Sequence, residues 1–274
     1  MHDLRPSAVA GSWYPGSQAR LAEAVDAHIA AASDSSRSCP RAIIAPHAGL
    51  MYSGPVAAYA YRLVRQCAYT AVVLVGPSHH VGFDGVSVWA RGAWDTPLGA
   101  VPVADELASA VAAESSDVVE YPAAHAREHS LEMQLPFVAR LLPGVPIVPL
   151  VMGHQRRETA QALGHALARA VAARPGERIL LIASSDLSHY EDATLAARVD
   201  AVVLRRVEAL DADGLMTLIE REPRHACGGG PIVSVLRAAI ELGCTEARVL
   251  RYGDSGDVSG DKSSVVGYMA AAVW

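Results

Sequence analysis

Short apolar runs alternate with longer amphipathic segments along almost the whole chain. The runs are rich in valine, isoleucine, leucine and alanine, which is typical of buried strands. They predict strands at residues 42–45, 71–75, 85–90, 145–152, 178–183, 248–252 and 265–271. Most of these are separated by segments with helical periodicity. The predicted helices are residues 18–32, 55–65, 104–114, 130–142, 157–173, 195–210, 213–220 and 231–242.

This alternation of strands and helices predicts the fold class. We expect a single three-layer α/β/α domain over residues 1–274, with a largely parallel or mixed central sheet covered on both faces. Two polar segments read as loops. Residues 33–40 precede the first core strand, and residues 253–264, rich in glycine and aspartate, are expected to form a mobile loop that could act as a lid.

Composition excludes several classes of protein. With 51% hydrophobic and 19% charged residues and a mean hydropathy of +0.20, the chain has too much apolar surface to be disordered. No apolar run approaches the roughly 18 residues of a membrane-spanning helix. Residues 1–17 lack the apolar core of a signal peptide, so we expect a cytoplasmic protein without a membrane association.

The charged residues and the cysteines give two further expectations, one on nucleic-acid binding and one on disulfides. The net charge is −6, and the basic residues are scattered arginines with Lys262 as the sole lysine, which argues against nucleic-acid binding. The four cysteines form no C-x-x-C pair and are expected to be free thiols; they are Cys39, Cys67, Cys227 and Cys244.

Polar residues follow three of the predicted strands at the point where each strand ends. His47 follows the first, His79 and His80 follow the second, and Ser184-Ser-Asp-Leu-Ser-His189 follows the strand at 178–183. Ligands of open α/β sheets bind outside the carboxyl ends of the strands. A single histidine is more simply a surface or core residue, but three such strand ends together predict a metal site in which His47 and His79 donate nitrogen.

The third ligand should be anionic, and the residues alone leave several candidates open. They are Asp186, Glu128, Glu132 and Cys227. Cys227 lies in a glycine-rich stretch just before a predicted helix, and a helix N-terminus stabilises a thiolate. The alternative is that Cys227 is a small buried apolar residue. The other three cysteines have no comparable setting.

Residues 128–136 form another dense polar stretch. Ser130 is expected to cap the helix that follows, and the Glu132 carboxylate is expected to stabilise the positive N-terminal end of this helix. A purely structural role therefore accounts for both residues. His129 is not explained as a cap, and we interpret it as a substrate-facing or outer-shell donor. Dinucleotide-binding, P-loop, α/β-hydrolase and EF-hand motifs are absent from the sequence.

Five of these stretches together resemble the Memo family, whose bacterial and archaeal members are also called AmmeMemoRadiSam system protein B. They are residues 42–49, 75–80, 128–136, 184–189 and 227–232, and residues 11–14 and 261–268 are similar to the family too. The resemblance therefore covers nearly the whole chain. It implies a fold shared with class III extradiol ring-cleaving dioxygenases of the LigB type, which bind non-haem Fe(II) through two histidines and one glutamate.

Carried over by position, the resemblance implies metal ligands at His47, His79 and Cys227, with Asp186 and His189 beside them. His189 corresponds to an acid/base histidine of the dioxygenases. The remaining predicted contacts with substrate or ligands are His80, His129, Glu132 and Tyr52. The cysteine stands where the dioxygenases have a carboxylate. Thiolate is the softer ligand, so it favours copper, zinc or thiolate-bound iron.

These features support three functional hypotheses. The first is a dioxygenase-like, metal-dependent oxidoreductase for an unknown small substrate, with Fe(II) preferred and copper or zinc as alternatives; Asp186 would balance charge and His189 would transfer a proton. The second is a non-catalytic protein that binds metal, a peptide or a partner, and the family's gene context suggests AMMECR-like and radical-SAM partners. The third is a zinc hydrolase.

Overall fold

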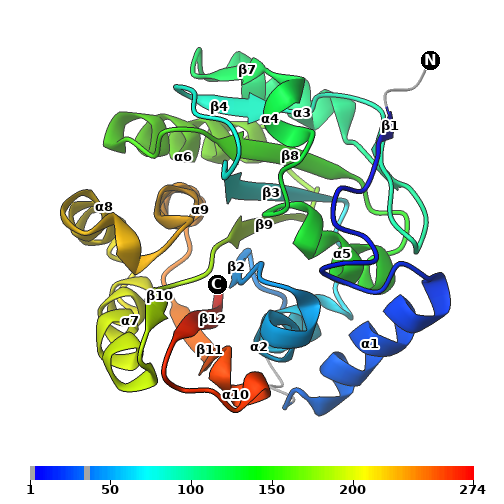
Figure 1. The fold of residues 1–274 in the computed structure, drawn as a ribbon. Helices are drawn as coiled ribbons and strands as arrows, with labels where there is room; N and C mark the ends of the chain where they lie inside the picture. The colour runs from blue at the N-terminus through cyan, green and yellow to red at the C-terminus, as the bar shows by residue number, and fades with distance from the viewer. Residues whose placement is uncertain (1–3, 34–37) are drawn as a thin grey trace.

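The computed structural model describes residues 4–33 and 38–274, and within them nine strands form one mixed sheet (Figure 1). The central strands β2, β9, β3 and β8 are parallel neighbours, and both flanks are partly antiparallel. Across the sheet the strands are β10 (His189–Glu191), β12 (Val265–Val273), β2 (Ala42–Ala45), β9 (Ile179–Ser184), β3 (Ala71–Pro77), β8 (Ile147–Met152), β4 (Val86–Val88) and β7 (Val118–Glu120), with β11 (Ala247–Asp254) also paired to β12.

Helices cover both faces of this sheet, which gives the three layers seen in Figure 1. One layer contains α1 (Gln18–Ala31), α2 (Leu50–Val64) and α5 (Leu135–Leu141). The other contains α6 (Arg157–Ala172), α7 (Ala193–Glu208), α8 (Ala212–Arg221) and α9 (Gly229–Glu241), with α3 (Asp105–Ala113) packed against α6. The predicted α/β/α class with a mixed sheet is confirmed.

Short elements complete the described part of the chain. A small second sheet contains β1 (Leu4–Arg5), β5 (Ala93–Trp94) and β6 (Val101–Pro102), and the short helices are α4 (Pro122–His125) and α10 (Gly256–Ser259). There are also two 3₁₀ turns: η1 (Glu132–Gln134) comes directly before α5, and η2 (Pro223–His225) lies between α8 and α9. No helix in the described ranges combines the length and the apolar character needed to cross a membrane.

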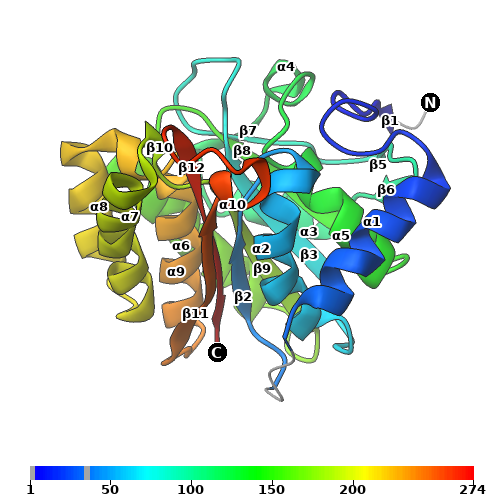
Figure 2. The same ribbon diagram turned by 60° about the horizontal axis from the view of Figure 1, so that its bottom comes forward.

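The central strands explain why the sequence shows continuous apolar runs. Every residue of β2, β3, β8 and β9 is buried, because helices cover both faces of the sheet there. Since β2, β3 and β9 run parallel, their carboxyl ends meet at one edge. Figure 2 shows this edge with α4, β10 and α10 around it, while Trp274 at the chain end lies at the opposite edge.

The prediction of four free cysteines is wrong for two of them. Cys39 and Cys67 form a disulfide, with an S–S distance of 2.06 Å, and Cys227 and Cys244 are free. Cys39 lies just before β2 and Cys67 just after α2. The β2–α2 unit folds back on itself and brings the two Cα atoms within 5.8 Å, a proximity that the separation of 28 residues does not reveal.

The predicted helix at 130–142 is also wrong in its first turn. The 3₁₀ turn η1 precedes α5, and the Ser130 hydroxyl donates to the Pro77 carbonyl oxygen at 2.8 Å instead of capping a helix. In the opposite sense, α2 begins five residues before the predicted start, because Pro55 lies inside the helix. The strands β1, β5, β6, β7 and β10 were not predicted, since two or three residues carry little periodicity.

One of the two predicted loops contains regular structure. The segment 253–264 is not wholly irregular: it contains the end of β11 and the helix α10, and the Lys262 ammonium contacts Asp254 at 2.8 Å and Asp257 at 2.5 Å. Of the loop predicted at 33–40, residues 34–37 lie outside the described residues.

Candidate metal centre

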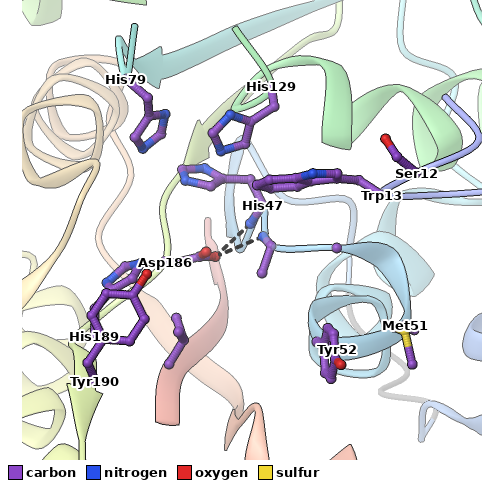
Figure 3. Close-up of a pocket in the computed structure, with 13 residues that line it drawn as sticks. Ser12, Trp13, His47, Met51, Tyr52, His79, His129, Asp186, His189 and Tyr190 are labelled. Atoms are coloured by element: carbon purple, nitrogen blue, oxygen red, sulfur yellow. Dashed lines mark hydrogen bonds between the residues drawn. The ribbon is translucent and has the colours of Figure 1, made fainter. Parts of the chain in front are cut away.

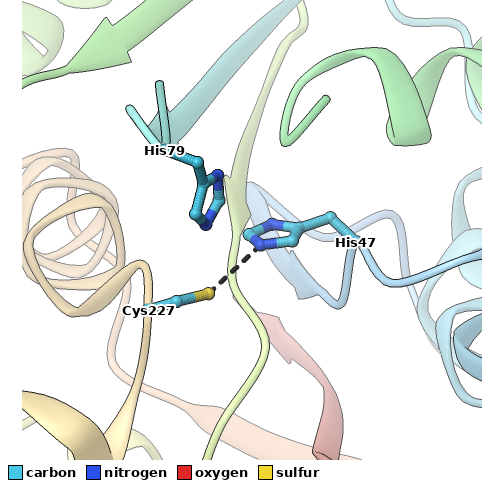
Figure 4. A group of neighbouring side chains, drawn as sticks. All are labelled: His47, His79 and Cys227. Atoms are coloured by element: carbon cyan, nitrogen blue, oxygen red, sulfur yellow. Dashed lines mark hydrogen bonds between the residues drawn. The ribbon is translucent and has the colours of Figure 1, made fainter. Parts of the chain in front are cut away.

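Three side chains from distant parts of the chain converge at the carboxyl edge of the sheet. His47 follows β2, His79 follows β3, and Cys227 precedes α9, and one donor atom of each lies within 4.8 Å of the others (Figure 4). His47 is buried at 2% exposure, whereas the His79 side chain is 29% exposed. The structure therefore brings together the three ligands that the sequence predicts.

The hydrogen bonds of Ser184 fix the tautomer of His47. The Ser184 hydroxyl donates its one proton to the Ser130 carbonyl oxygen at 2.6 Å and accepts from the Gln134 amide at 2.7 Å. His47 Nδ1 lies 2.9 Å from the same oxygen, so it must be the donor there. Nε2 of His47 is then left with a free lone pair, and burial, followed by the neighbouring imidazoles, holds the pKa of this histidine well below its usual range.

Glu128 fixes the tautomer of His79 in the same way. Its Oε1 lies 2.8 Å from His79 Nδ1, and a carboxylate can only accept. Burial works against the charge of Glu128, but hydrogen bonds from the His79 ring and from nearby backbone N–H groups outweigh it and hold the pKa of this carboxyl far below its usual range. His79 therefore donates from Nδ1 and has Nε2 free, the arrangement common among histidines that bind metals.

Cys227 closes the triad with its sulfur. Sγ lies 3.1 Å from Nε2 of His47 and accepts the Asp186 backbone N–H at 3.2 Å. Burial, with the nearby Asp186 carboxyl adding to it, raises the pKa of the Cys227 thiol well above its usual range. Since Nε2 of His47 has no proton, the thiol donates to it. A cation between these atoms would take the place of that proton.

A second cluster of possible ligands contains His79, Glu128 and His129. Glu128 is already committed, because its two oxygens accept from the His79 ring and from the backbone N–H groups of His79, His129 and Ser130. It therefore orients His79 and is a poor ligand. His129 stacks on His79 with ring centroids 4.5 Å apart, and burial lowers its pKa to about 4, so it is neutral at pH 7.

Asp186 and His189 lie beside the triad, as predicted. Oδ1 of Asp186 accepts the backbone N–H groups of His47 at 2.7 Å and Ala48 at 3.2 Å, so it fixes the turn that carries His47. Burial nevertheless raises the pKa of Asp186 to about 6. His189 Nδ1 donates to the Leu187 carbonyl oxygen at 2.8 Å, which leaves Nε2 as a proton acceptor.

His47 and His79 of the triad line a pocket of about 580 Å³ (Figure 3). Its wall is mostly apolar and aromatic, and it includes the predicted Tyr52 and His129 together with His47, His79, Asp186 and His189. The described lining residues include no lysine or arginine. The remaining lining residues are Ser12, Trp13, Ala48, Gly49, Met51, Tyr190 and Val266.

Two of the predicted contacts lie outside this pocket. His80 is exposed, and its ring lies 3.4 Å from the Arg127 guanidinium. Glu132 is buried: its carboxylate pairs with Arg5 at 2.6 Å and accepts from the Tyr14 hydroxyl and the N–H groups of Ala8 and Val9. It therefore holds the N-terminal segment that leads to Trp13.

Three large side chains of the pocket wall were not among the predicted site residues. Trp13, whose ring lies 4.3 Å from that of His129, belongs to a stretch that carried the resemblance, which could have indicated it. Met51 is 60% exposed and Tyr190 is 78% exposed at the pocket mouth. The backbone of Tyr190 has φ of 67°, a strained value for a bulky residue, and nothing in the sequence indicates it.

Several known proteins are similar to this chain over most of its length. The profile of the Memo-like protein family matches residues 5–272. A MEMO1 family protein of Methanothermobacter thermautotrophicus is 42% identical over 229 residues, covering 83% of this chain and 82% of that protein. A MEMO1 family protein of Thermotoga maritima is 37% identical over 98% of this chain and 99% of its own length.

One solved structure adds evidence on the fold alone. An uncharacterized protein from Escherichia coli K12 superposes with a TM-score of 0.53 at 16% identity, covering 84% of this chain and 98% of that one. The family match spans almost the entire sequence, and it includes the strand ends that carry His47 and His79 and the turn that carries Cys227. The chain belongs to the Memo family.

Proposed function

We propose that this protein is a metal-dependent redox enzyme whose ion, iron or copper, is held by His47, His79 and Cys227. The observation that carries the proposal is the position of the protons on the two histidines of the triad. Ser184 and Glu128 occupy the Nδ1 protons of the two histidines, so both Nε2 lone pairs are free near one thiol. Ligand sets of two imidazoles and one thiolate suit iron, copper and zinc.

The residues around the triad support such an ion. Glu128 supplies the outer carboxylate that raises the basicity of a metal-binding histidine. Bound iron or copper would supply one-electron chemistry and an open position for a small oxidant such as dioxygen. The triad brings one negative charge when Cys227 is ionised, and Asp186 can add a second.

Asp186 and His189 would handle protons in this site. Nε2 of His189 is free to accept a proton from a substrate hydroxyl in the pocket, because Nδ1 is committed to Leu187. Asp186 has a pKa of about 6 and can change its charge near neutral pH. The aromatic wall without lysine or arginine among the described lining residues favours a small, flat and weakly charged substrate.

The pocket rim supports a second candidate function. Trp13 is 38% exposed, and it lies near the still more exposed Met51 and Tyr190. Exposed apolar side chains around a concave site also suit a peptide or a protein partner. On this alternative the triad would hold metal without turnover, and AMMECR-like or radical-SAM proteins would be the partners.

Metal analysis of matched cysteine variants tests the proposal. Cys227→Ser removes the proposed ligand thiolate. Cys244→Ser removes the other free thiol, which follows the end of α9, whereas Cys227 precedes its start. Loss of a residue that only orients a ligand lowers metal affinity by roughly 10–100-fold. We expect Cys227→Ser to lower the affinity for iron and copper by more than this, and Cys244→Ser to bind these metals like the parent. Equal affinity in all three proteins would mean that Cys227 is not a ligand.

Turnover separates the three functional hypotheses. Protein loaded anaerobically with iron or copper would be tested for oxygen uptake with catechols and other small reductants. Metal-dependent uptake that is lost in His189→Gln supports the redox enzyme. Tight metal binding without turnover, together with recovery of a stable partner, supports the binding protein, and hydrolysis with abundant zinc supports the hydrolase.

A further inference from the structure

The disulfide lies at the opposite end of the sheet from the metal centre. Cys39 precedes the amino end of β2, whereas His47 follows its carboxyl end. Figure 2 shows the C-terminal end of the chain at the edge of the sheet opposite α4 and α10, and Trp274 at this end lines the same cavity as Cys39. A site around this disulfide would therefore be independent of the pocket that holds His47.

One of the two cysteines of the disulfide lines a cavity of about 350 Å³. Cys39 is partly exposed and lines this cavity, whereas Cys67 is buried and is not among the described lining residues. The other described lining residues are Ser38, Pro40, Arg41, Arg178, Leu242, Gly243, Cys244 and Trp274. The cavity therefore offers an approach to the disulfide from the side of Cys39.

Two arginines line the same cavity as Cys39. Arg41 immediately precedes β2 and Arg178 immediately precedes β9, and these strands are parallel neighbours, so both arginines lie at the amino edge of the sheet. No acidic side chain is among the described residues that line the cavity. Arginine binds carboxylates with two parallel hydrogen bonds, so the cavity suits a ligand that carries a carboxylate.

We propose that Cys39 is a thiol-exchange site for a small monothiol that carries a carboxylate. The thiolate of the ligand attacks Cys39 Sγ, a new S–S bond forms there, and the bond to Cys67 breaks. Cys67 leaves as a thiolate and takes a proton from water. A second ligand thiolate would release Cys39, so that two thiols are oxidised to one disulfide while the protein disulfide is reduced.

The surroundings of the two remaining sulfurs fit this direction of attack. Cys67 Sγ lies 3.3 Å from the Leu63 carbonyl oxygen, so the released thiol would have a hydrogen-bond acceptor in place. Cys244 is buried, and burial raises the pKa of its thiol even though Arg41 lies near enough to oppose the shift. It would stay protonated and unreactive, which makes Cys244→Ser a control.

Two probes of similar size and opposite charge test the role of the arginines. Protein with an intact disulfide is treated with 3-mercaptopropionate or with cysteamine, and the rate of mixed-disulfide formation is followed by mass spectrometry. For each protein, the rate with 3-mercaptopropionate is divided by the rate with cysteamine. This rate ratio in the parent is then divided by the rate ratio in Arg41→Gln/Arg178→Gln, and the resulting quotient cancels the intrinsic reactivity of each thiol. We expect this quotient to be on the order of tenfold.

Two further readouts keep the test decisive. The adduct should lie on Cys39 in the parent and in Cys244→Ser, and the preference for the carboxylate probe in the parent should fall as salt is raised from low to about 1 M ionic strength. The salt series decides the question if the double arginine variant does not fold. A quotient near one, a preference insensitive to salt, or an adduct on Cys67 would each overturn the proposal.

Discussion

His79 and His80 are adjacent in sequence but lie in different surroundings. The His79 ring is held by Glu128 and points its free nitrogen at Cys227, whereas His80 is exposed and lies near Arg127. Successive side chains after a strand diverge, so one strand end aims only one of the two at the crevice. The pair therefore offers an internal control for the metal site.

Alanine substitutions should separate the two histidines. We expect His79→Ala to abolish tight binding of iron or copper, because one of three ligands is lost, and His80→Ala to change the Kd only modestly. Titration of each variant with the metal alone, followed by calorimetry, measures both values. Comparable losses in the two variants would show that the ligand is not assigned correctly between them.

The proton on Cys227 predicts how metal affinity depends on pH. Burial raises the pKa of this thiol, so near neutral pH it is protonated and must lose its proton when metal binds. Raising the pH favours the side of the equilibrium that releases a proton. The Kd should therefore fall about tenfold for each pH unit, up to the raised pKa of the thiol.

The measurement is a metal titration at several pH values with a non-coordinating buffer. Cys227→Ser provides the control, since a serine hydroxyl has no proton to release in this range and the contribution of one proton should disappear from the slope. A parent protein whose Kd does not change between pH 7 and pH 8 would indicate that the thiol is already ionised.

At the scale of elements, the β2–α2 unit carries both the disulfide and much of the pocket. The disulfide joins Cys39 and Cys67, which are 28 residues apart, and the loop between them contains the pocket residues His47 and Tyr52. A crosslink that closes a loop of this length contributes about 3 kcal/mol, mainly by restricting the unfolded chain. We expect Cys39→Ser/Cys67→Ser to lower the free energy of unfolding by about that amount, measured with urea.

Controls for this experiment exist within the chain. Cys244→Ser removes a buried thiol that makes no crosslink, so it measures the cost of placing one serine hydroxyl in a buried site, about 1–3 kcal/mol. The parent in reductant should resemble the double serine variant. If reductant leaves the parent unchanged while the double variant is destabilised, the loss would come from the serines and not from the missing crosslink.

The N-terminal segment depends on one buried ion pair. Glu132 and Arg5 are 0% and 1% exposed, and Glu132 also accepts from Tyr14 and the backbone of Ala8. Removing one partner leaves a buried charge unpaired. We expect Glu132→Ala to cost about 3–5 kcal/mol, and Asp26→Ala, which breaks the exposed pair with Arg140, to cost less than about 1 kcal/mol.

Urea unfolding of both variants measures these costs, and limited proteolysis shows whether residues 4–14 detach. A loss of stability in Glu132→Ala no larger than that in Asp26→Ala would contradict the predicted role of the ion pair. Detachment would also move Trp13 out of the pocket, since Glu132 accepts from the backbone N–H of Val9 before Trp13 and from the Tyr14 hydroxyl after it.

The elements also show what the sequence could and could not predict. His47, His79 and Asp186 were accessible to prediction because each follows a strongly apolar parallel strand, and the ends of such strands meet by geometry. The Cys39–Cys67 bond, the partners of Glu132 and the strained Tyr190 were not, because they depend on contacts between distant segments or on a local backbone bulge. Local periodicity contains no information on either.

At the scale of the whole molecule, the proposed metal centre joins segments that span most of the chain. His47, His79 and Cys227 are separated by up to 180 residues, so the triad exists only when β2, β3 and α9 are packed around the sheet. Metal binding is therefore linked to folding, because the unfolded chain cannot present the three donors together. An ion that binds the native state should stabilise the entire domain.

Thermal unfolding of the apo and loaded protein checks this linkage. At free metal one hundred times the Kd, the native state gains about 2.7 kcal/mol, which corresponds to a rise in Tm of roughly 5–10 °C for a domain of this size. Cys227→Ser should show no comparable rise at the same metal concentration, while Cys244→Ser should match the parent. A rise of equal size in Cys227→Ser would mean that the stabilising ion binds elsewhere, and the three donors would then have to be reassigned.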